Sequence, residues 1–139
     1  MNHWIIIFAS WAISMVATLG SLFFSEVMLL PPCVLCWYQR ICMYPLTLVL
    51  LIGFIFSEKN VVKYAAPLAI IGWFIAFYHN LLYYKWLPES AAPCKQGISC
   101  TSVQIEWLGF ITIPFLSFIS FTIILGLLYT AHRKLSYAK

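Results

Sequence analysis

Four long apolar stretches, separated by short polar segments, dominate the pattern of the chain. They contain no Asp, Glu, Lys or Arg and cover residues 5–24, 41–57, 64–84 and 107–131. A helix of about 20 apolar residues crosses the hydrocarbon core of a bilayer. Because the second stretch is shorter than that, its helix is expected to begin earlier, at about Leu35 to Trp37. The pattern therefore predicts four transmembrane helices, over about residues 5–24, 37–57, 64–84 and 107–131, in a single domain over residues 1–139.

Local signals are compatible with all four helices. The first stretch is longer than the core of a signal peptide, and no small-x-small cleavage site follows it, so it is expected to remain in the protein. Pro67 and Pro114 fall near the predicted starts of the third and fourth helices. There the missing N–H group of proline has no partner to lose.

Composition supports a membrane protein and excludes two other classes. Of the 139 residues, 63% are hydrophobic and 9% are charged, whereas about a quarter of the residues of a soluble domain are charged. An ordinary soluble enzyme is therefore excluded, and an aromatic content of 18% excludes a disordered chain. The sequence predicts an all-α integral membrane protein, built as a four-helix transmembrane bundle.

The charged residues predict the orientation of the bundle. The side with both termini carries five basic residues and one acid: Lys59, Lys63, Arg133, Lys134, Lys139 and Glu58. On the other side three basic residues are balanced by three acids: Arg40, Lys85, Lys95, Glu26, Glu89 and Glu106. Loops rich in Lys and Arg stay in the cytoplasm, so both termini are expected there, in a bacterial cytoplasmic membrane. The net charge of +4 thus indicates membrane orientation, and no nucleic-acid partner is expected.

Four of the five cysteines fall in the two short loops on the extracytoplasmic side. Cys33 and Cys36 precede the second helix, and Cys94 and Cys100 follow the third. Disulfides persist outside the bacterial cytoplasm. Four cysteines allow three pairings, of which the spacing favours the two local ones.

The Cys33-Val34-Leu35-Cys36 motif has the spacing of a redox-active pair. Two prolines precede it and a helix follows, so unpaired N–H groups and the helix dipole favour a thiolate there. Arg40 lies one turn beyond Cys36 on the same face, where its charge could hold a thiolate or a developing anion on an electron acceptor. The alternatives are an interfacial arginine that reaches lipid head groups and half of a structural zinc site.

The second pair, Cys94 and Cys100, encloses a short loop. Closing a ring of about seven residues contributes only about 2.4 kcal/mol through lost chain entropy, which adds little to a bundle that lipid already holds. The pair therefore suits a disulfide that opens and closes. A purely structural bridge is the alternative.

Two more candidate residues lie within the predicted helices. His79 is in the external half of the third helix, and an ionisable residue inside a membrane is a functional candidate. It is taken as a possible cofactor-binding residue, although a hydrogen-bonded interhelical histidine explains it equally well. Cys42 lies in an apolar segment and is interpreted as a buried, unreactive thiol.

Two external dithiols in one small membrane protein suggest an electron relay. A soluble reduced dithiol would attack one bridge, the two pairs would exchange, and electrons would leave through the membrane-embedded pair. The sequence has no haem, flavin or iron–sulfur signature, and no metal is expected. A quinone in the bilayer fits as the acceptor, with its head over Cys36 and with Arg40 polarising a carbonyl oxygen.

One stretch of the chain resembles a family signature: Leu30-Pro31-Pro32-Cys33-Val34-Leu35-Cys36-Trp37-Tyr38-Gln39-Arg40. The signature is that of the disulfide-bond formation protein B (DsbB) family. Nearly the whole chain shares the resemblance, through four spans, two external cysteine pairs in that order, and the segment Glu106-Trp107-Leu108-Gly109-Phe110 with Pro114 beyond. The short chain and the closely spaced second pair resemble the small Gram-positive branch of this family.

The resemblance implies a role for each candidate residue. Cys33 and Cys36 match the quinone-proximal pair, in which Cys36 engages the quinone, and Arg40 matches an arginine that supports quinone reduction. Cys94 and Cys100 match the pair that takes electrons from an extracytoplasmic thioredoxin-fold thiol oxidase of the DsbA or BdbD type. Cys94 is then the expected mixed-disulfide partner. Menaquinone is expected rather than ubiquinone.

The implied activity is that of a quinone-dependent protein dithiol oxidoreductase, which supports disulfide bond formation in exported proteins. The chain departs from the family pattern at Gln39, where a glutamate is often found, and His79 has no secure counterpart in that pattern. One alternative is a quinone reductase similar to vitamin K epoxide reductase, although its CxxC motif opens the last helix and not the second. Another is a non-enzymatic tetraspan scaffold with structural disulfides or zinc ligands.

Overall fold

The computed structural model describes residues 2–94, 106–107 and 111–138. Within these residues four helices are long and apolar enough to cross a membrane. They are α1 (His3–Leu22), α2 (Val34–Ile55), α3 (Val61–Tyr83) and α4 (Ile113–Tyr137). The predicted four-helix bundle is confirmed.

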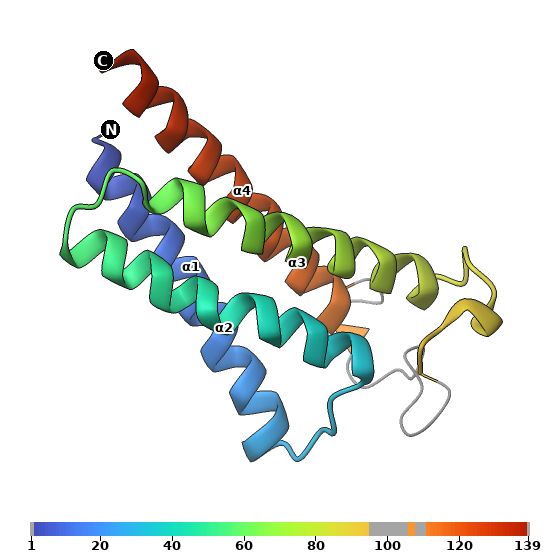
Figure 1. Ribbon diagram of the computed structural model, residues 1–139. Helices are drawn as coiled ribbons and strands as arrows, with labels where there is room; N and C mark the ends of the chain where they lie inside the picture. The colour runs from blue at the N-terminus through green and yellow to red at the C-terminus, as the bar shows by residue number, and fades with distance from the viewer. Residues whose placement is uncertain (1, 95–105, 108–110, 139) are drawn as a thin grey trace.

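The four helices form a closed ring of contacts. α1 packs against α2 and α4, and α3 packs against the same two helices. Figure 1 shows that the N- and C-termini lie at one end of the bundle, together with the turn between α2 and α3. The start of α2 and the segment that follows α3 lie at the opposite end. The two ends of the molecule thus carry different parts of the sequence, as the charge pattern predicts.

The fourth helix begins later than the sequence predicts and runs further. The prediction of a helix from residue 107 is wrong, because Glu106–Trp107 forms a short strand, β1, that pairs antiparallel with β2 (Ile111–Thr112). Thr112 caps the helix by accepting a hydrogen bond from the Phe115 N–H at 3.4 Å, and a proline follows in the first turn. A run of uncharged residues marks an apolar segment, but capping decides where its helix begins.

The other helices deviate less from their predicted ranges. α1 is followed directly by a π-helical turn, η1 (Phe23–Val27), and the chain then turns at Leu29, which has a φ of 54°. α2 begins at Val34, close to the expected Leu35. After α3, a single 3-10 turn, η2 (Glu89–Ala91), leads towards the second cysteine loop.

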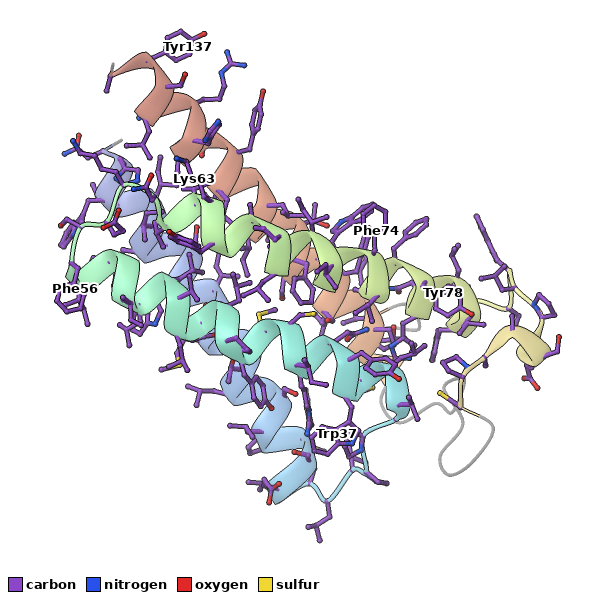
Figure 2. All side chains as sticks on the ribbon, in the orientation of Figure 1. Trp37, Phe56, Lys63, Phe74, Tyr78 and Tyr137 are labelled. Carbon is purple, nitrogen blue, oxygen red and sulfur yellow. The ribbon has the colours of Figure 1, made fainter. Side chains whose placement is uncertain are left out.

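The outer faces of the helices are apolar. Val16, Leu48 and Phe74 expose 71%, 61% and 60% of their surface, although each lies in the middle of a helix. Phe74 points away from the bundle in Figure 2. Such exposed apolar faces are uncommon on soluble monomers and suit contact with lipid.

Small polar residues of α1 face the bundle interior. Ser10 and Ser14 are fully buried, and their hydroxyls donate to backbone carbonyls of their own helix. The Thr18 and Thr47 hydroxyls lie 3.1 Å apart and join α1 to α2. In a membrane such polar contacts, together with close packing, hold helices together.

Two clusters of buried residues make up the interior. The larger one runs along the bundle and includes Leu46, Leu50, Phe121 and Ile124. The smaller one lies at the end opposite the termini and is built around Cys33, Leu35 and Leu82. Cys33 of this second cluster, and Cys36 and Cys94 packed against it, are among the candidate redox residues that the sequence predicts.

Candidate redox site

The first cysteine pair opens α2. Cys33 is the N-cap residue of the helix, with extended backbone angles (φ −75°, ψ 171°) that follow two prolines. Its Sγ accepts a hydrogen bond from the Cys36 N–H at 3.3 Å. A sulfur in this position meets unpaired N–H groups and the positive end of the helix dipole, both of which stabilise a thiolate.

Both cysteines of the motif are free thiols, and their Sγ atoms lie 2.8 Å apart. The hydrogen bond from the Cys36 thiol and, to a smaller extent, the contact with His79 hold the pKa of the Cys33 thiol well below its usual range. Burial acts in the opposite direction and is outweighed. These contacts favour the thiolate form of Cys33.

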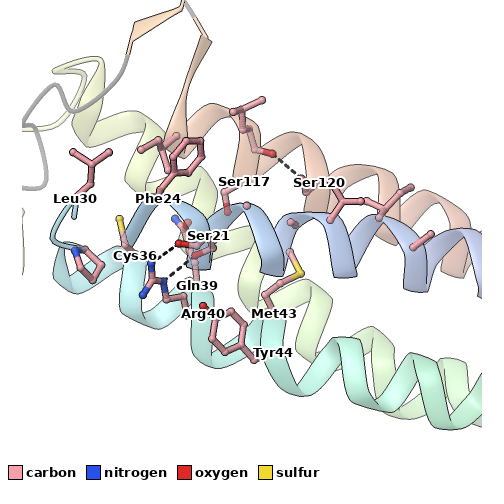
Figure 3. Close-up of a pocket in the computed structure, with 18 residues that line it drawn as sticks. Ser21, Phe24, Leu30, Cys36, Gln39, Arg40, Met43, Tyr44, Ser117 and Ser120 are labelled. Atoms are coloured by element: carbon pink, nitrogen blue, oxygen red, sulfur yellow. Dashed lines mark hydrogen bonds between the residues drawn. The ribbon is translucent and has the colours of Figure 1, made fainter. Parts of the chain in front are cut away.

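A cavity of about 510 Å³ lies between α1, α2 and α4, beside this pair. This volume falls in the range of small-molecule sites. Most of its lining is apolar, from Ala12, Ile13, Val16, Ala17, Gly20, Phe24, Leu30, Pro32, Met43, Ile113 and Leu116. Cys36, Gln39 and Arg40 form the polar part of its wall on α2 (Figure 3). Val16 and Leu116 are also exposed on the outer surface, so the cavity reaches the face that meets lipid.

Arg40 is held in the wall of this cavity by α1. Its Nε donates to the Ser21 Oγ and its Nη2 donates to the Ser21 backbone carbonyl, both at 2.9 Å, as the dashed lines of Figure 3 show. Its guanidinium carbon lies 5.5 Å from the centre of the Trp37 ring, within range of a cation–π contact. The cation is therefore oriented within the bundle and does not extend freely towards lipid head groups.

Ser21 is a site residue that the sequence interpretation missed. It was noted only as a small polar group in an apolar stretch. Its spacing from Ser14 and Thr18 puts all three on one side of α1, and this signal could have identified it as a residue that faces α2.

His79 does not line the cavity, although the sequence suggested it as a cofactor-binding residue. It is 2% exposed, and its Nε2 lies 3.8 Å from the Cys33 Sγ. Its Nδ1 lies 3.1 Å from the Gln39 Nε2. The structure thus brings His79 to the cysteine pair from α3, while the cavity lies towards α1 and α4.

Cys94 packs against the cluster that contains Cys33. It is half-buried and disulfide-bonded, whereas the other predicted member of its pair, Cys100, lies outside the described residues. The segment before Cys94 is held by the Tyr78 hydroxyl, which donates to the Ala91 carbonyl at 2.6 Å. One residue of the second pair is therefore close to the first pair.

Cys42 lies apart from this arrangement, in the large interior cluster, with 5% of its surface exposed. Its predicted burial is confirmed. Met43 and Leu46 belong to the same cluster, and such an apolar setting suits an unreactive thiol.

Cys33, Cys36 and His79 also have the ligand types of a metal site, with their donor atoms within 4.8 Å of one another. Two thiolates bound tetrahedrally to zinc at about 2.3 Å lie about 3.8 Å apart. The Cys33 and Cys36 sulfurs are closer than this. Their spacing suits thiol–disulfide exchange better than metal binding.

The fold and the site define a class: a multi-pass membrane protein with a CxxC thiol pair at the start of its second transmembrane helix. Residues 3–131 match the family described as "Disulfide bond formation protein DsbB". The chain belongs to this family, as its CxxC signature suggested.

Several relatives cover most of the chain. It is 46% identical to Disulfide bond formation protein C of Bacillus subtilis (strain 168) over 124 residues, which are 89% of this chain and 90% of that protein. A Probable disulfide formation protein C of Halalkalibacterium halodurans is 46% identical over 83% of this chain and 84% of its own length. A Probable disulfide formation protein of Metapseudomonas resinovorans is 39% identical over 94% and 92%. No solved structure has significant similarity to the chain.

The family and the names of these relatives identify the chain as a disulfide oxidoreductase of the membrane. The two predictions of family and of fold class are therefore confirmed.

Proposed function

We propose that this protein reoxidises an extracytoplasmic thioredoxin-fold thiol oxidase and passes the electrons to a membrane quinone. Electrons enter at Cys94 and Cys100, move to Cys33 and Cys36, and leave through the cavity beside Cys36. The product is a disulfide in the partner, which then oxidises exported proteins.

One observation carries this proposal: Cys36 and an oriented Arg40 share one apolar cavity that reaches the lipid-facing surface. A reactive thiol in such a cavity meets molecules dissolved in the bilayer. The cavity fits a flat apolar head group, since it is mostly lined by apolar side chains and has a cation at one wall. A bound quinone would supply a two-electron, two-proton acceptor, and we propose menaquinone in preference to ubiquinone.

Different residues of the chain have different roles in the proposed reaction. Cys36 presents a sulfur to the cavity, and Arg40 stabilises negative charge that develops on an oxygen in its reach. The surrounding apolar side chains exclude water, which strengthens this electrostatic interaction. Cys94 packs against the cluster that contains Cys33, so that the two pairs can exchange once the loop bridge is opened.

The orientation belongs to the same proposal. Both termini and the basic residues of the α2–α3 turn are placed in the cytoplasm, which puts both cysteine pairs outside it. A soluble thiol oxidase then reaches Cys94 without crossing the membrane.

The test is a mass-shift analysis of the cysteines in the full-length protein in lipid nanodiscs. After reduction with dithiothreitol and removal of the reductant, a short-chain menaquinone is added, and remaining thiols are alkylated and counted. We expect Cys33, Cys36, Cys94 and Cys100 to become protected together, with one quinol formed for each pair. Thiols that stay fully alkylatable in the presence of menaquinone would contradict the proposal. Ubiquinone in the same assay measures the preference between quinones.

A further inference from the structure

The contacts of His79 connect the cysteine pair to a residue of the cavity wall. On one side its Nε2 lies 3.8 Å from the Cys33 sulfur. On the other side its Nδ1 lies 3.1 Å from the amide nitrogen of Gln39. His79 and Gln39 expose 2% and 7% of their surfaces, so both contacts are shielded from water.

The Gln39 contact determines which ring nitrogen of His79 carries the proton. An amide nitrogen only donates hydrogen bonds, so the His79 Nδ1 must accept one. In a neutral imidazole the proton then sits on Nε2, the atom that faces Cys33. His79 is therefore prepared to donate an N–H to the Cys33 sulfur, and a sulfur that accepts a hydrogen bond is favoured as a thiolate.

We propose that His79 is a positioning residue for the redox reaction: oriented by Gln39, it holds the reduced Cys33 as a thiolate that closes the disulfide with Cys36. The role in the catalytic cycle rests on the function proposed above. The effect on the Cys33 sulfur does not, because it needs neither quinone nor partner.

The step that His79 supports is the re-formation of the Cys33–Cys36 bond. The Cys33 thiolate and the Cys36 thiol lose two electrons and one proton, and the S–S bond forms. The quinone takes up the two electrons and two protons, one of them from the medium. Only a deprotonated Cys33 is nucleophilic, so the fraction of thiolate at Cys33 limits this step.

The other groups near Cys33 are separable from His79. The Cys36 thiol also stabilises a Cys33 thiolate, but it comes from α2, as does Arg40, which points to the cavity and to Ser21. Tyr78 comes from α3 and donates to the Ala91 carbonyl. The disulfide-bonded Cys94 does not titrate, and residues 112–115 at the start of α4 are uncharged. His79 is therefore the nitrogen donor from outside α2 at this sulfur, among the described residues.

The experiment measures the reactivity of Cys33 alone. In a full-length background with Cys36→Ser, Cys42→Ser, Cys94→Ser and Cys100→Ser, Cys33 is the sole thiol. Its alkylation rate by iodoacetamide in nanodiscs is recorded against pH and normalised to the plateau at high pH, so that differences in access cancel. The variants compared are His79→Leu, His79→Gln and Gln39→Leu, with His132→Leu on the exposed end of α4 as the matched control.

We expect His79→Leu to move the profile to higher pH by about one unit or more, which is a tenfold fall in rate on its acid limb. His79→Gln retains an N–H donor and should restore part of the shift, and Gln39→Leu should produce a smaller shift in the same direction. His132→Leu should leave the profile unchanged.

A His79→Leu profile that overlays the background profile would overturn the proposal. A His79→Leu protein with a lower melting temperature but an unchanged pH profile of Cys33 alkylation would also overturn it, since this is the behaviour of a merely structural histidine. An unchanged profile for Gln39→Leu would refute the role of Gln39. Because the assay contains no quinone, its result is independent of the menaquinone experiment above.

Discussion

At the scale of single residues, the two cysteines of the CxxC motif have different neighbours although their sulfurs are in contact. Cys33 is buried at the N-cap of α2, next to His79 and Cys94. Cys36 lies one turn into the helix and faces the cavity with Arg40. In the proposed relay, Cys33 is therefore the sulfur nearer the loop pair, and Cys36 is the one nearer the quinone. We therefore expect the two thiols to have different roles.

Cys36→Ser should abolish quinone reduction, because no sulfur then faces the cavity. The measurement is menaquinone-dependent oxidation of added dithiol by the purified protein. Cys42→Ser is the matched control, since this thiol lies in the large interior cluster, and its turnover should equal that of the unmodified protein. A Cys36→Ser protein that still reduces quinone would contradict the proposed route.

Arg40→Ala should slow quinone reduction by about 100-fold, the usual effect of removing one preorganised group that stabilises developing charge. Thiol exchange with a reduced partner should change far less, because Arg40 lines the cavity and Cys94 does not. Ser21→Ala retains the cation but removes one of its two anchors, so its effect should be intermediate. Equal losses in both half-reactions for Arg40→Ala would point to a structural role instead.

At the scale of the elements, small residues decide how closely the helices approach. Gly72 of α3 lies against the Phe121 ring of α4, and a Cβ atom added there would overlap that ring. Gly53 has the same relation to Val61 across the α2–α3 turn. In membranes such small residues let helix backbones come close, because lipid supplies no hydrophobic force between helices.

Gly72→Ala should lower the stability of the bundle by about 1 to 3 kcal/mol, the usual cost of overpacking a well-filled interior. Gly126→Ala is the matched control on α4, because a Cβ there meets nothing within 4 Å. Thermal unfolding of both variants in the same detergent compares them. Equal melting temperatures would show that α3 and α4 adjust without cost.

A hydrogen bond from Tyr78 to the Ala91 carbonyl links the segment before Cys94 to α3. Tyr78→Phe removes this bond and keeps the ring, so it should loosen the position of Cys94 without unfolding the bundle. We expect transfer of electrons from the loop pair to the CxxC pair to slow by about tenfold, the factor that corresponds to the loss of one hydrogen bond of about 1 to 1.5 kcal/mol. Rapid-quench alkylation after reduction of the loop pair measures this rate. Quinone reduction by a directly reduced CxxC pair should remain normal, and a loss there instead would contradict the assignment.

At the scale of the whole molecule, the termini and the cysteine cluster lie at opposite ends of the bundle. The termini and Lys63 lie at one end, and Trp37 and Tyr78 lie at the other, near the cysteine cluster (Figure 2). The described cysteines of the proposed relay, Cys33, Cys36 and Cys94, thus belong to one end of the molecule, which the proposal places on the external side of the membrane.

A membrane-impermeant maleimide should label the reduced Cys94 and Cys100 in intact cells, because both are placed outside the cytoplasm. A single cysteine introduced by Ser57→Cys, in the turn between α2 and α3, is the control and should be labelled only after the membrane is opened. The reverse pattern would invert the bundle and disconnect it from an extracytoplasmic partner.

Much of this architecture could be predicted from the sequence, because a transmembrane helix satisfies its own backbone hydrogen bonds. Length and hydrophobicity therefore decide the number of spans, and the distribution of Lys and Arg predicts their orientation. The CxxC pair at the start of a helix could also be predicted, because its signal lies in one short stretch of sequence. Cys33 and Cys36 are three residues apart and follow two prolines. The start of α4 was missed, because it depends on a cap at Thr112 and a strand pair and not on hydropathy.

The sequence by itself determined the four spans and the family signature, and it singled out the cysteines that we propose carry the chemistry. Only the tertiary structure decided that Arg40 is held by Ser21, that His79 contacts Cys33 and not the cavity, and that Cys94 packs beside the first pair. These contacts join helices that are far apart in the chain. They depend on the rotation and approach of whole helices, which arise from the packing of all interior side chains together. No local pattern of residues encodes that geometry.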